Sequence, residues 1–200
     1  MSRERFFPVA AMQPPVVWIE DRERTNVDFS VSWPKPPYLT DKEYGRCMEA
    51  FPRACADIIA IEPRSKRFYL VKRIHHSALG VWNFGGGIRR GQLPGEAAVM
   101  NLERETGIKL AVHELTFLYH TIMFWKRRNP APQELGEHTI LYTFCFVPTA
   151  EEIAKIKLDP TEYDIAHGIK LYDREELNQL NESHRDMLLV YHSAAFGHTT

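Results

Sequence analysis

Apolar runs alternate with polar segments along most of the chain, and the spacing of these runs predicts its secondary structure. Six runs rich in β-branched or aromatic residues predict strands, at residues 56–62, 67–73, 81–84, 114–125, 138–147 and 168–172. The first two runs are separated by Pro63-Arg64-Ser65-Lys66, which predicts a hairpin. The polar, proline-bearing segment 126–137 predicts a loop between two of the later strands.

Residues 93–107 (LPGEAAVMNLERETG) show helical spacing instead of strand alternation. Ala98 and Leu102 fall on one face of this segment. Pro94 is compatible with the first turn, and Gly107 is typical of a helix end. The segment therefore predicts one helix with an apolar face.

Further helices are predicted toward the C-terminus. The segment 149–156 (TAEEIAKI) opens on a threonine cap followed by acidic residues, and 173–195 contains one or two helices. Strands before and after the helices, with hairpins between them, predict an α+β fold in the form of an α/β/α sandwich around a mixed β-sheet.

The first 38 residues differ from the rest of the chain. They contain six prolines, with Trp18 and Trp33 set among charged residues, which leaves little room for regular helix. We therefore predict an N-terminal arm at 1–38 and a folded domain at 39–200.

The composition narrows the classes of function. The 200 residues carry a net charge of -1, with 26% charged and 44% hydrophobic residues, as is typical of a soluble globular protein. This charge gives no bulk attraction to nucleic acid, and no apolar run reaches the roughly 18 residues that span a bilayer. We expect a cytoplasmic protein without nucleic-acid or membrane partners. The three cysteines form no C-x-x-C pair and are expected to be buried thiols.

A glycine-rich segment followed by arginines is the strongest candidate for a binding site. Consecutive glycines at 85–87 let the backbone approach a ligand closely, because no Cβ stands in the way. Arg89 and Arg90 follow, and guanidinium groups suit phosphate oxygens. The alternative is a tight turn with two solvated arginines.

The helix that follows adds a carboxylate to this segment. Asn101 and Glu105 lie four residues apart and share the face that can look at the glycines. Glu103 lies about 200° away around the helix and is expected to face solvent. One carboxylate together with main-chain and phosphate oxygens can hold Mg²⁺, which keeps several waters and needs few protein ligands.

These residues resemble the Nudix box, G-x5-E-x7-R-E-U-x-E-E-x-G-U, in which U is a bulky aliphatic residue. Leu102, Glu105, Gly107 and Ile108 match its end, and counting back from Gly107 places its first glycine at Gly86. Four charged positions of the box are changed, and they are held by Gln92, Met100, Asn101 and Arg104. The resemblance implies the Nudix fold and a hydrolase.

The stretch 39–195 looks like the GDP-mannose mannosyl hydrolase branch of this family, which departs from the box in the same direction and keeps the glutamate that corresponds to Glu105. This resemblance implies that Asp57 contacts the sugar and that Arg73 helps the diphosphate to leave. It also implies Mg²⁺, with Mn²⁺ as an alternative, on Glu105 and on the carbonyl of Gly86 or Gly87.

The same resemblance assigns further residues to the substrate and implies a homodimer. His138 falls in a matching stretch, and Arg89 or Arg90 takes the place of an arginine that follows the glycines in the relative. The base that removes a proton from water falls near Asp164, with His167 close by in the same polar loop, and the choice between these two stays open. The adjacent pair His75-His76 lacks metal-ligand spacing and is expected at the surface.

The sequence thus predicts a hydrolase of a nucleoside diphosphate sugar, in which water attacks the anomeric carbon and releases a nucleoside diphosphate and a free sugar. Two alternatives remain. One is attack at phosphorus, against which the changed glutamates argue. The other is a non-catalytic Nudix-fold module that binds a nucleotide sugar.

Overall fold

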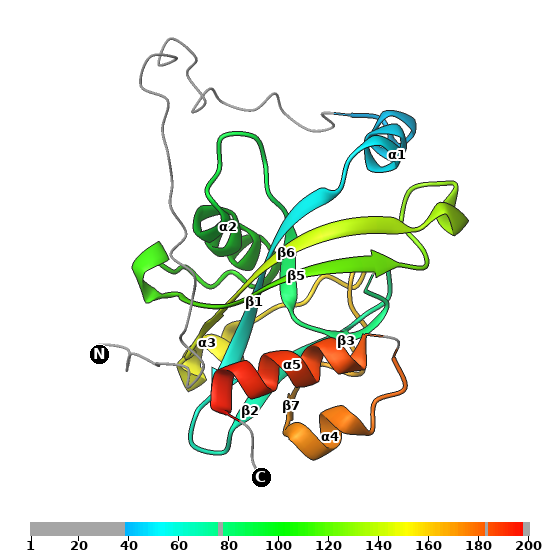
Figure 1. Ribbon diagram of the computed structural model, residues 1–200. Helices are drawn as coiled ribbons and strands as arrows, with labels where there is room; N and C mark the ends of the chain where they lie inside the picture. The colour runs from blue at the N-terminus through cyan, green and yellow to red at the C-terminus, as the bar shows by residue number, and fades with distance from the viewer. Residues whose placement is uncertain (1–38, 76–77, 183, 198–200) are drawn as a thin grey trace.

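The computed structural model describes residues 39–75, 78–182 and 184–197. The predicted arm at 1–38 and one of the two adjacent histidines, His76, lie outside these residues. In the described part of the chain, seven strands form one mixed sheet with helices packed on it (Figure 1).

Strand β1 (Arg53–Glu62) lies in the middle of the sheet and pairs along both of its edges. One edge pairs in parallel with β6 (Glu137–Phe146). The other edge is divided between two antiparallel partners: β4 (Phe84–Gly87) covers its first half and β2 (Arg67–Arg73) covers its end. β1 is therefore held by three strands that come from three separate parts of the sequence.

The remaining strands extend the sheet on both sides. β3 (Gly80–Trp82) and β7 (Ile169–Tyr172) both pair antiparallel with β2. β5 (Thr116–Trp125) pairs antiparallel with β6 and gives the order β3-β2-β1-β6-β5. Apart from the parallel pair β1 and β6, every described pairing is antiparallel.

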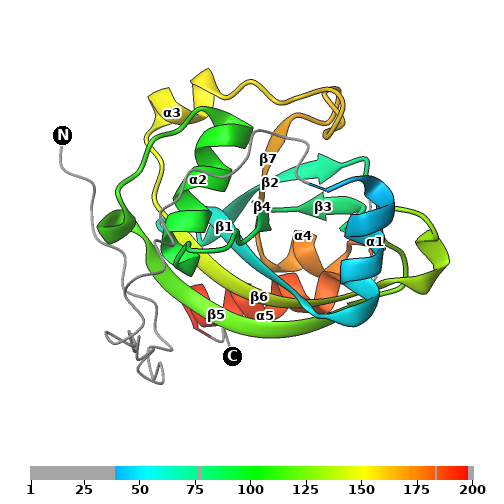
Figure 2. The ribbon, with the colours of Figure 1, turned by 90° about the horizontal axis from the view of Figure 1, so that it is seen from above.

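Helices cover the two faces of this sheet, as Figure 2 shows. α2 (Pro94–Thr106) packs on one face, where its buried alanines meet Ala56 of β1. α5 (Arg185–Phe196) covers the other face, with α4 (Arg174–Asn178) beside it. The two short helices α1 (Asp41–Ala50) and α3 (Ala150–Lys155) lie at the periphery. The predicted α+β fold, a sandwich of helices around a mixed sheet, is confirmed.

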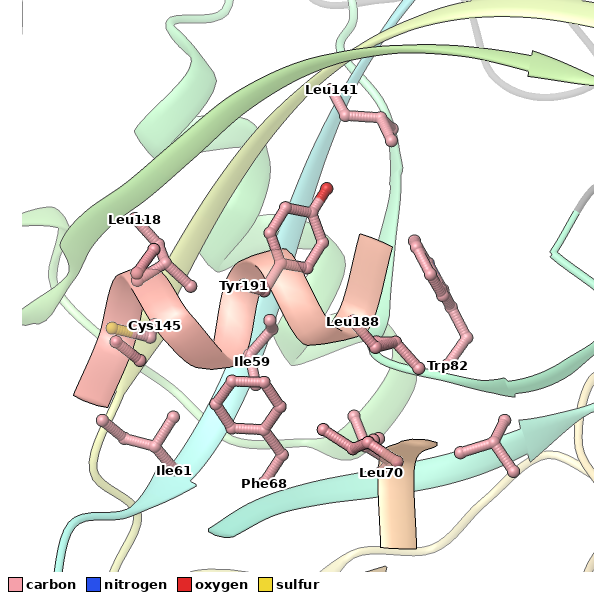
Figure 3. Packing of buried hydrophobic residues seen from close by; sticks show 14 of the residues in the cluster. Ile59, Ile61, Phe68, Leu70, Trp82, Leu118, Leu141, Cys145, Leu188 and Tyr191 are labelled. Carbon is pink, nitrogen blue, oxygen red and sulfur yellow. The ribbon is translucent and has the colours of Figure 1, made fainter. Parts of the chain in front are cut away.

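The larger core lies between α5 and the sheet (Figure 3). Leu188 and Tyr191 of α5 are fully buried there, against Ile59 of β1 and Phe68 of β2. These side chains alternate with residues that face α2, because successive residues of a strand point to opposite faces. β1 is consequently apolar at nearly every position, as a strand covered on both faces requires.

A buried arginine fixes α1 against the loop that joins β5 to β6. Arg128 has almost no solvent exposure, and it donates to the carbonyls of Gly45, Pro130 and Pro132 at 3.1 Å each. Its Nη2 also donates to Glu49 at 2.9 Å. The guanidinium therefore satisfies carbonyls from two distant segments, which a solvated loop arginine would not do.

Most predicted elements agree with the structure, with three differences. The helix α1 at Asp41–Ala50 was not predicted. The run 81–84 is broken at Asn83 and contributes to two strands, β3 and β4, because β3 pairs with β2 whereas β4 turns to pair with β1. β1 also begins earlier than the apolar run at 56–62 predicts, at Arg53. The helix at 93–107 is confirmed, with Gly107 in the left-handed conformation at its end.

The pairing of β4 with β1 depends on glycine at one position. Gly85 lies opposite Asp57, and a Cβ on Gly85 would lie 2.2 Å from Oδ1 of Asp57 and 2.8 Å from its Cα. A Cβ on Gly87 would meet nothing within 4 Å. Only the first glycine is thus required by close backbone approach.

We predict that Gly85→Ala lowers the free energy of unfolding by about 3 kcal/mol or more, because neither the backbone nor the buried carboxylate can move away. Gly87→Ala, the matched control, should change it by less than about 1 kcal/mol. Urea denaturation of both variants checks this, and equal losses in the two would contradict the steric argument.

Candidate active site

A cavity of about 630 Å³ opens beside β1 and β4. Its walls come from α1, from strands β1, β4, β5 and β6, from the C-terminal end of α2, and from the loop 156–168 that precedes β7. Asp57, Arg73 and Glu105, which were assigned to substrate or metal from the sequence, all line this cavity. So do the predicted metal-binding glycines Gly86 and Gly87.

Asp57 is a buried carboxylate in the wall of the cavity, with 5% of its surface exposed. Its Oδ2 accepts a hydrogen bond from Nε1 of Trp82 at 3.1 Å. Burial raises the pKa of Asp57 to about 6, although hydrogen bonds from Asn83 and Trp82 and the charge of Arg73 favour its ionised form. Its protonation state therefore changes close to neutral pH.

Glu105 is held by three donors at the end of α2. Its Oε2 accepts from the backbone N–H of Gly85 at 3.1 Å and from the hydroxyl of Tyr163 at 2.7 Å. Its Oε1 accepts from Nη2 of Arg104 at 2.7 Å. Glu105 therefore lies on the face of α2 that is directed toward the glycines, as the sequence predicts. Asn101 lies on the same face, and its Nδ2 is 3.4 Å from the carbonyl oxygen of Ala56. Glu103 faces solvent as expected and pairs with Lys109.

Arg73, at the end of β2, lies near the carboxylates of Glu105 and Glu162 in the cavity wall. Its Nη2 lies 3.6 Å from Oε2 of Glu162, and its backbone bridges to Tyr163. Burial and the nearby charge of Glu105 raise the pKa of Tyr163, so its hydroxyl stays protonated and donates to Glu105. Glu162 and Tyr163 both line the cavity, as does Asp159 of the same loop.

The cavity wall also contains aromatic side chains and a second ion pair. Tyr44 of α1 and Trp125 of β5 line the cavity, and Arg53 of the same wall pairs with the buried carboxylate of Glu137. Arg53 also donates to the hydroxyl of Tyr44 at 3.0 Å. Burial raises the pKa of the neighbouring Cys55 thiol to about 12, so this cysteine is a packing residue and not a nucleophile. The expectation that Cys55 and Cys145 are buried holds, whereas Cys47 is exposed.

Five of the residues assigned to the site from the sequence do not line the cavity. Asp164 pairs instead with Lys72 at 3.1 Å, and His167 contacts the hydroxyl of Tyr172 at 2.8 Å. Both therefore lie apart from the cavity, because the loop turns its other carboxylates, on Asp159 and Glu162, toward it.

His138 is the third such residue, and the alternation of β6 explains its position. Glu137, Thr139 and Leu141 face the cavity, so His138 points to the opposite side of the sheet, where its ring stacks on Phe124. Arg89 and Arg90 also lie outside the cavity wall, in the loop between β4 and α2.

Sequence reasoning missed most of the other residues that the structure brings to the cavity, and three of them bear on its chemistry. His75, expected at the surface, is part of the wall, and so are Glu162 and Arg104. No sequence pattern distinguishes Glu162, since it is one of several acidic residues in a polar loop. The sequence shows Arg104 only as a departure from the Nudix box. Its position in the cavity wall depends on how α2 packs against β1.

The comparison with protein families decides where this chain belongs. The family model of the NUDIX domain matches residues 51–191, well over half of the sequence. The chain belongs to the NUDIX domain family. This membership makes it a Nudix-type hydrolase that acts on a small-molecule nucleotide derivative. Among the described residues, none of the helices of this Nudix domain is both long and apolar enough to cross a membrane.

Solved structures resemble this Nudix domain in fold. A MutT NUDIX hydrolase from Burkholderia pseudomallei has a TM-score of 0.52 at 18% identity, and the match covers 70% of this chain and 96% of that protein. The MutT protein from Methanosarcina mazei Go1 has a TM-score of 0.51 at 15% identity, over 70% and 93%. Together with the family model they confirm the predicted Nudix fold. Among curated proteins, no sequence matches this chain significantly.

Nudix hydrolases generally use a divalent metal such as Mg²⁺, but the described residues of this domain do not fit one. Asn101 and Arg104 stand where the box has acids, and Glu105 already accepts three hydrogen bonds, one of them from Arg104. Within residues 39–75, 78–182 and 184–197, no three His, Cys, Asp or Glu side chains are grouped so that they could hold a metal ion. The expected Mg²⁺ or Mn²⁺ site on Glu105, Gly86 and Gly87 therefore has a single carboxylate, which is already hydrogen-bonded, and the guanidinium of Arg104 lies directly beside it.

The raised pKa of Asp57 predicts a pH dependence of stability. Because its pKa rises from 3.8 to about 6 in the folded protein, the native state binds this proton more tightly than the unfolded state. Burial of the ionised Asp57 thus lowers the free energy of unfolding by about 3 kcal/mol above about pH 6, and this penalty is absent below about pH 4, where the carboxyl is protonated in both states. Asp57→Asn should remove that penalty.

We expect Asp57→Asn to be more stable than the wild type at pH 7.5 and nearly equal to it at pH 4, in urea denaturation at both values. Asp186→Asn, which changes an exposed carboxylate on α5, is the control. A stability difference of the same size at both pH values would contradict the raised pKa.

Proposed function

We propose that this Nudix domain hydrolyses a nucleoside diphosphate sugar of the GDP-mannose type, by attack of water at the anomeric carbon. The observation that carries the proposal is the meeting of Asp57, Arg73 and Glu105 in one cavity, although they come from three distant segments. The products are a nucleoside diphosphate and a free sugar.

The cavity supplies a group for each part of such a substrate. Asp57 accepts hydrogen bonds from sugar hydroxyls, as the resemblance implies, and Arg73 binds the diphosphate. Tyr44 and Trp125 in the cavity wall offer ring faces against which a nucleobase packs. A volume of about 630 Å³ falls within the range of small-molecule sites.

We assign to Glu162 the role of accepting the proton from water. It lines the cavity beside Arg73, whereas Asp164 and His167 do not. In the proposed step, the water oxygen bonds to the anomeric carbon while its proton passes to Glu162. The bond between that carbon and the β-phosphate oxygen breaks, and its electron pair stays on the departing diphosphate, where Arg73 stabilises the charge.

Attack at phosphorus is the second candidate. It would give a nucleoside monophosphate and a sugar phosphate in place of a nucleoside diphosphate and a free sugar. The exchange of acidic box positions for Asn101 and Arg104 speaks against it. The homodimer implied by the resemblance stays a prediction, which analytical ultracentrifugation checks.

The position of solvent oxygen in the products separates the two routes. GDP-mannose and a panel of sugar nucleotides are incubated with the protein in ¹⁸O water, and products are followed by ³¹P NMR and mass spectrometry. We expect ¹⁸O on the free sugar. Label on a phosphate would place the attack at phosphorus, and saturable binding without any product would indicate the non-catalytic module.

We predict that Glu162→Gln lowers kcat by about 100-fold or more, because general-base catalysis typically contributes that much. Glu103→Gln, which changes a solvent-facing glutamate of α2, should leave kcat within about 2-fold. Steady-state kinetics on the best substrate checks both. Full activity in Glu162→Gln, with loss in Asp164→Asn or His167→Gln, would return the role of base to the residues assigned from the sequence.

A further inference from the structure

The guanidinium of Arg104 lies at the place where a metal ion was expected. Its Nη1 donates to Oδ1 of Asn101 at 3.0 Å and its Nη2 donates to Oε1 of Glu105 at 2.7 Å. The same Nη2 lies 3.0 Å from the position that a Cβ on Gly86 would occupy. The positive charge of Arg104 therefore already lies between Oδ1 of Asn101, the carboxylate of Glu105 and Gly86, where a metal ion would bind.

Glu105 has little capacity left for a second cation. A carboxylate offers about four acceptor positions, and three are taken by Gly85, Tyr163 and Arg104. Mg²⁺ demands near-octahedral oxygen ligands, and it would have to approach within a few ångströms of a full positive charge. Arg104 thus opposes a metal ion both by occupying a ligand and by repulsion.

The same guanidinium remains available to an anion. Arg104 lines the cavity, and 53% of its side chain is exposed. Its two bonds to Asn101 and Glu105 use two of five N–H donors, and they fix the orientation of the plane. A guanidinium held in this way matches the spacing of phosphate oxygens.

Arg73 provides an independent observation at the same site. Its side chain is only 19% exposed, and its Nε is buried without a hydrogen-bond partner among the described residues. A buried cationic donor without a partner is costly unless a ligand satisfies it. Arg73 and Arg104 both line the cavity, on either side of the bonded pair Glu105 and Tyr163.

We propose that Arg104 and Arg73 form a diphosphate-binding site that works without a divalent metal ion. Arg104 takes over the charge that a metal would supply, and Arg73 gains a partner for its buried Nε. This inference rests on the proposed function, because the ligand is the diphosphate of the substrate. It goes further in stating that the affinity for that diphosphate comes from guanidinium groups alone.

Inorganic pyrophosphate in the presence of EDTA is the direct probe. Isothermal titration calorimetry with the full-length wild-type chain should show saturable, salt-sensitive binding in EDTA, and adding Mg²⁺ in place of EDTA should not tighten Kd by more than about 3-fold. Binding that disappears in EDTA and returns with Mg²⁺ would overturn the proposal, as would no binding under either condition. This measurement needs no variant and therefore does not depend on how a substitution folds.

Variants of Arg104 and Arg73 then test whether these two residues bind the pyrophosphate. Arg104→Gln and Arg73→Gln should each weaken pyrophosphate binding in EDTA by about 10-fold or more, the loss expected for a charge-assisted hydrogen bond. Arg185→Gln, on α5 and away from the cavity, should leave Kd unchanged within about 2-fold. Unchanged binding in Arg104→Gln, with folding confirmed by thermal melting, would contradict the assignment.

Mn²⁺ binding gives a readout that involves neither phosphate nor catalysis. We expect electron paramagnetic resonance to show only weak Mn²⁺ binding by the wild type and at least about 10-fold tighter binding by Arg104→Glu, which adds a carboxylate and removes the repulsion. Tight Mn²⁺ binding by the wild type would overturn the proposal. If no sugar nucleotide is hydrolysed but pyrophosphate binds in EDTA, the proposed function fails and the anion site stands.

Discussion

The pairing of β1 on both of its edges is the constraint on which the rest of the structure depends. β6 takes one edge along most of its length, and the other edge is shared between β4 and β2. Asp57 lies in the part that pairs with β4, so its carboxylate is carried into the interior by backbone hydrogen bonding rather than by any preference of its own. The glycine at position 85 is the condition for that pairing.

The same strand positions the end of α2. Ala97 and Ala98 pack on Ala56, so the helix lies close to β1, and its last turn brings Glu105 within hydrogen-bond distance of the Gly85 amide. Gly85 thus pairs with Asp57 in the sheet and donates its N–H to Glu105, and the charge of Glu105 adds to the burial that raises the pKa of Asp57. The chemistry of the cavity follows from small residues at the contact between helix and strand.

The parts of the fold that depend on local periodicity could be predicted, and the parts that depend on docking could not. The hairpin after residue 62 and the end of α2 at Gly107 follow from turn chemistry. His138 shows the limit: the alternation of β6 separates it from Glu137 and Thr139, but both faces of that strand are partly apolar, so sequence alone does not say which one meets the cavity. Glu162 lines the cavity and Asp164 does not, and this difference depends on the conformation of the loop 156–168, which no repeating sequence pattern predicts.

The absence of acids at three box positions, held by Gln92, Asn101 and Arg104, has a chemical consequence for the bond that is broken. Attack at phosphorus brings a nucleophile toward an anionic group, and charge spreads over several phosphoryl oxygens, which metal ions commonly neutralise. Attack at the anomeric carbon leaves the diphosphate as the departing group, so no nucleophile has to approach the anionic phosphorus, and the new negative charge is shared by the oxygens of the departing β-phosphate. Two guanidinium groups can stabilise that charge without a metal. Arg104, placed against Glu105, therefore suits attack at the anomeric carbon. The proposed hydrolysis and the proposed metal-free diphosphate site support each other, although each can fail alone.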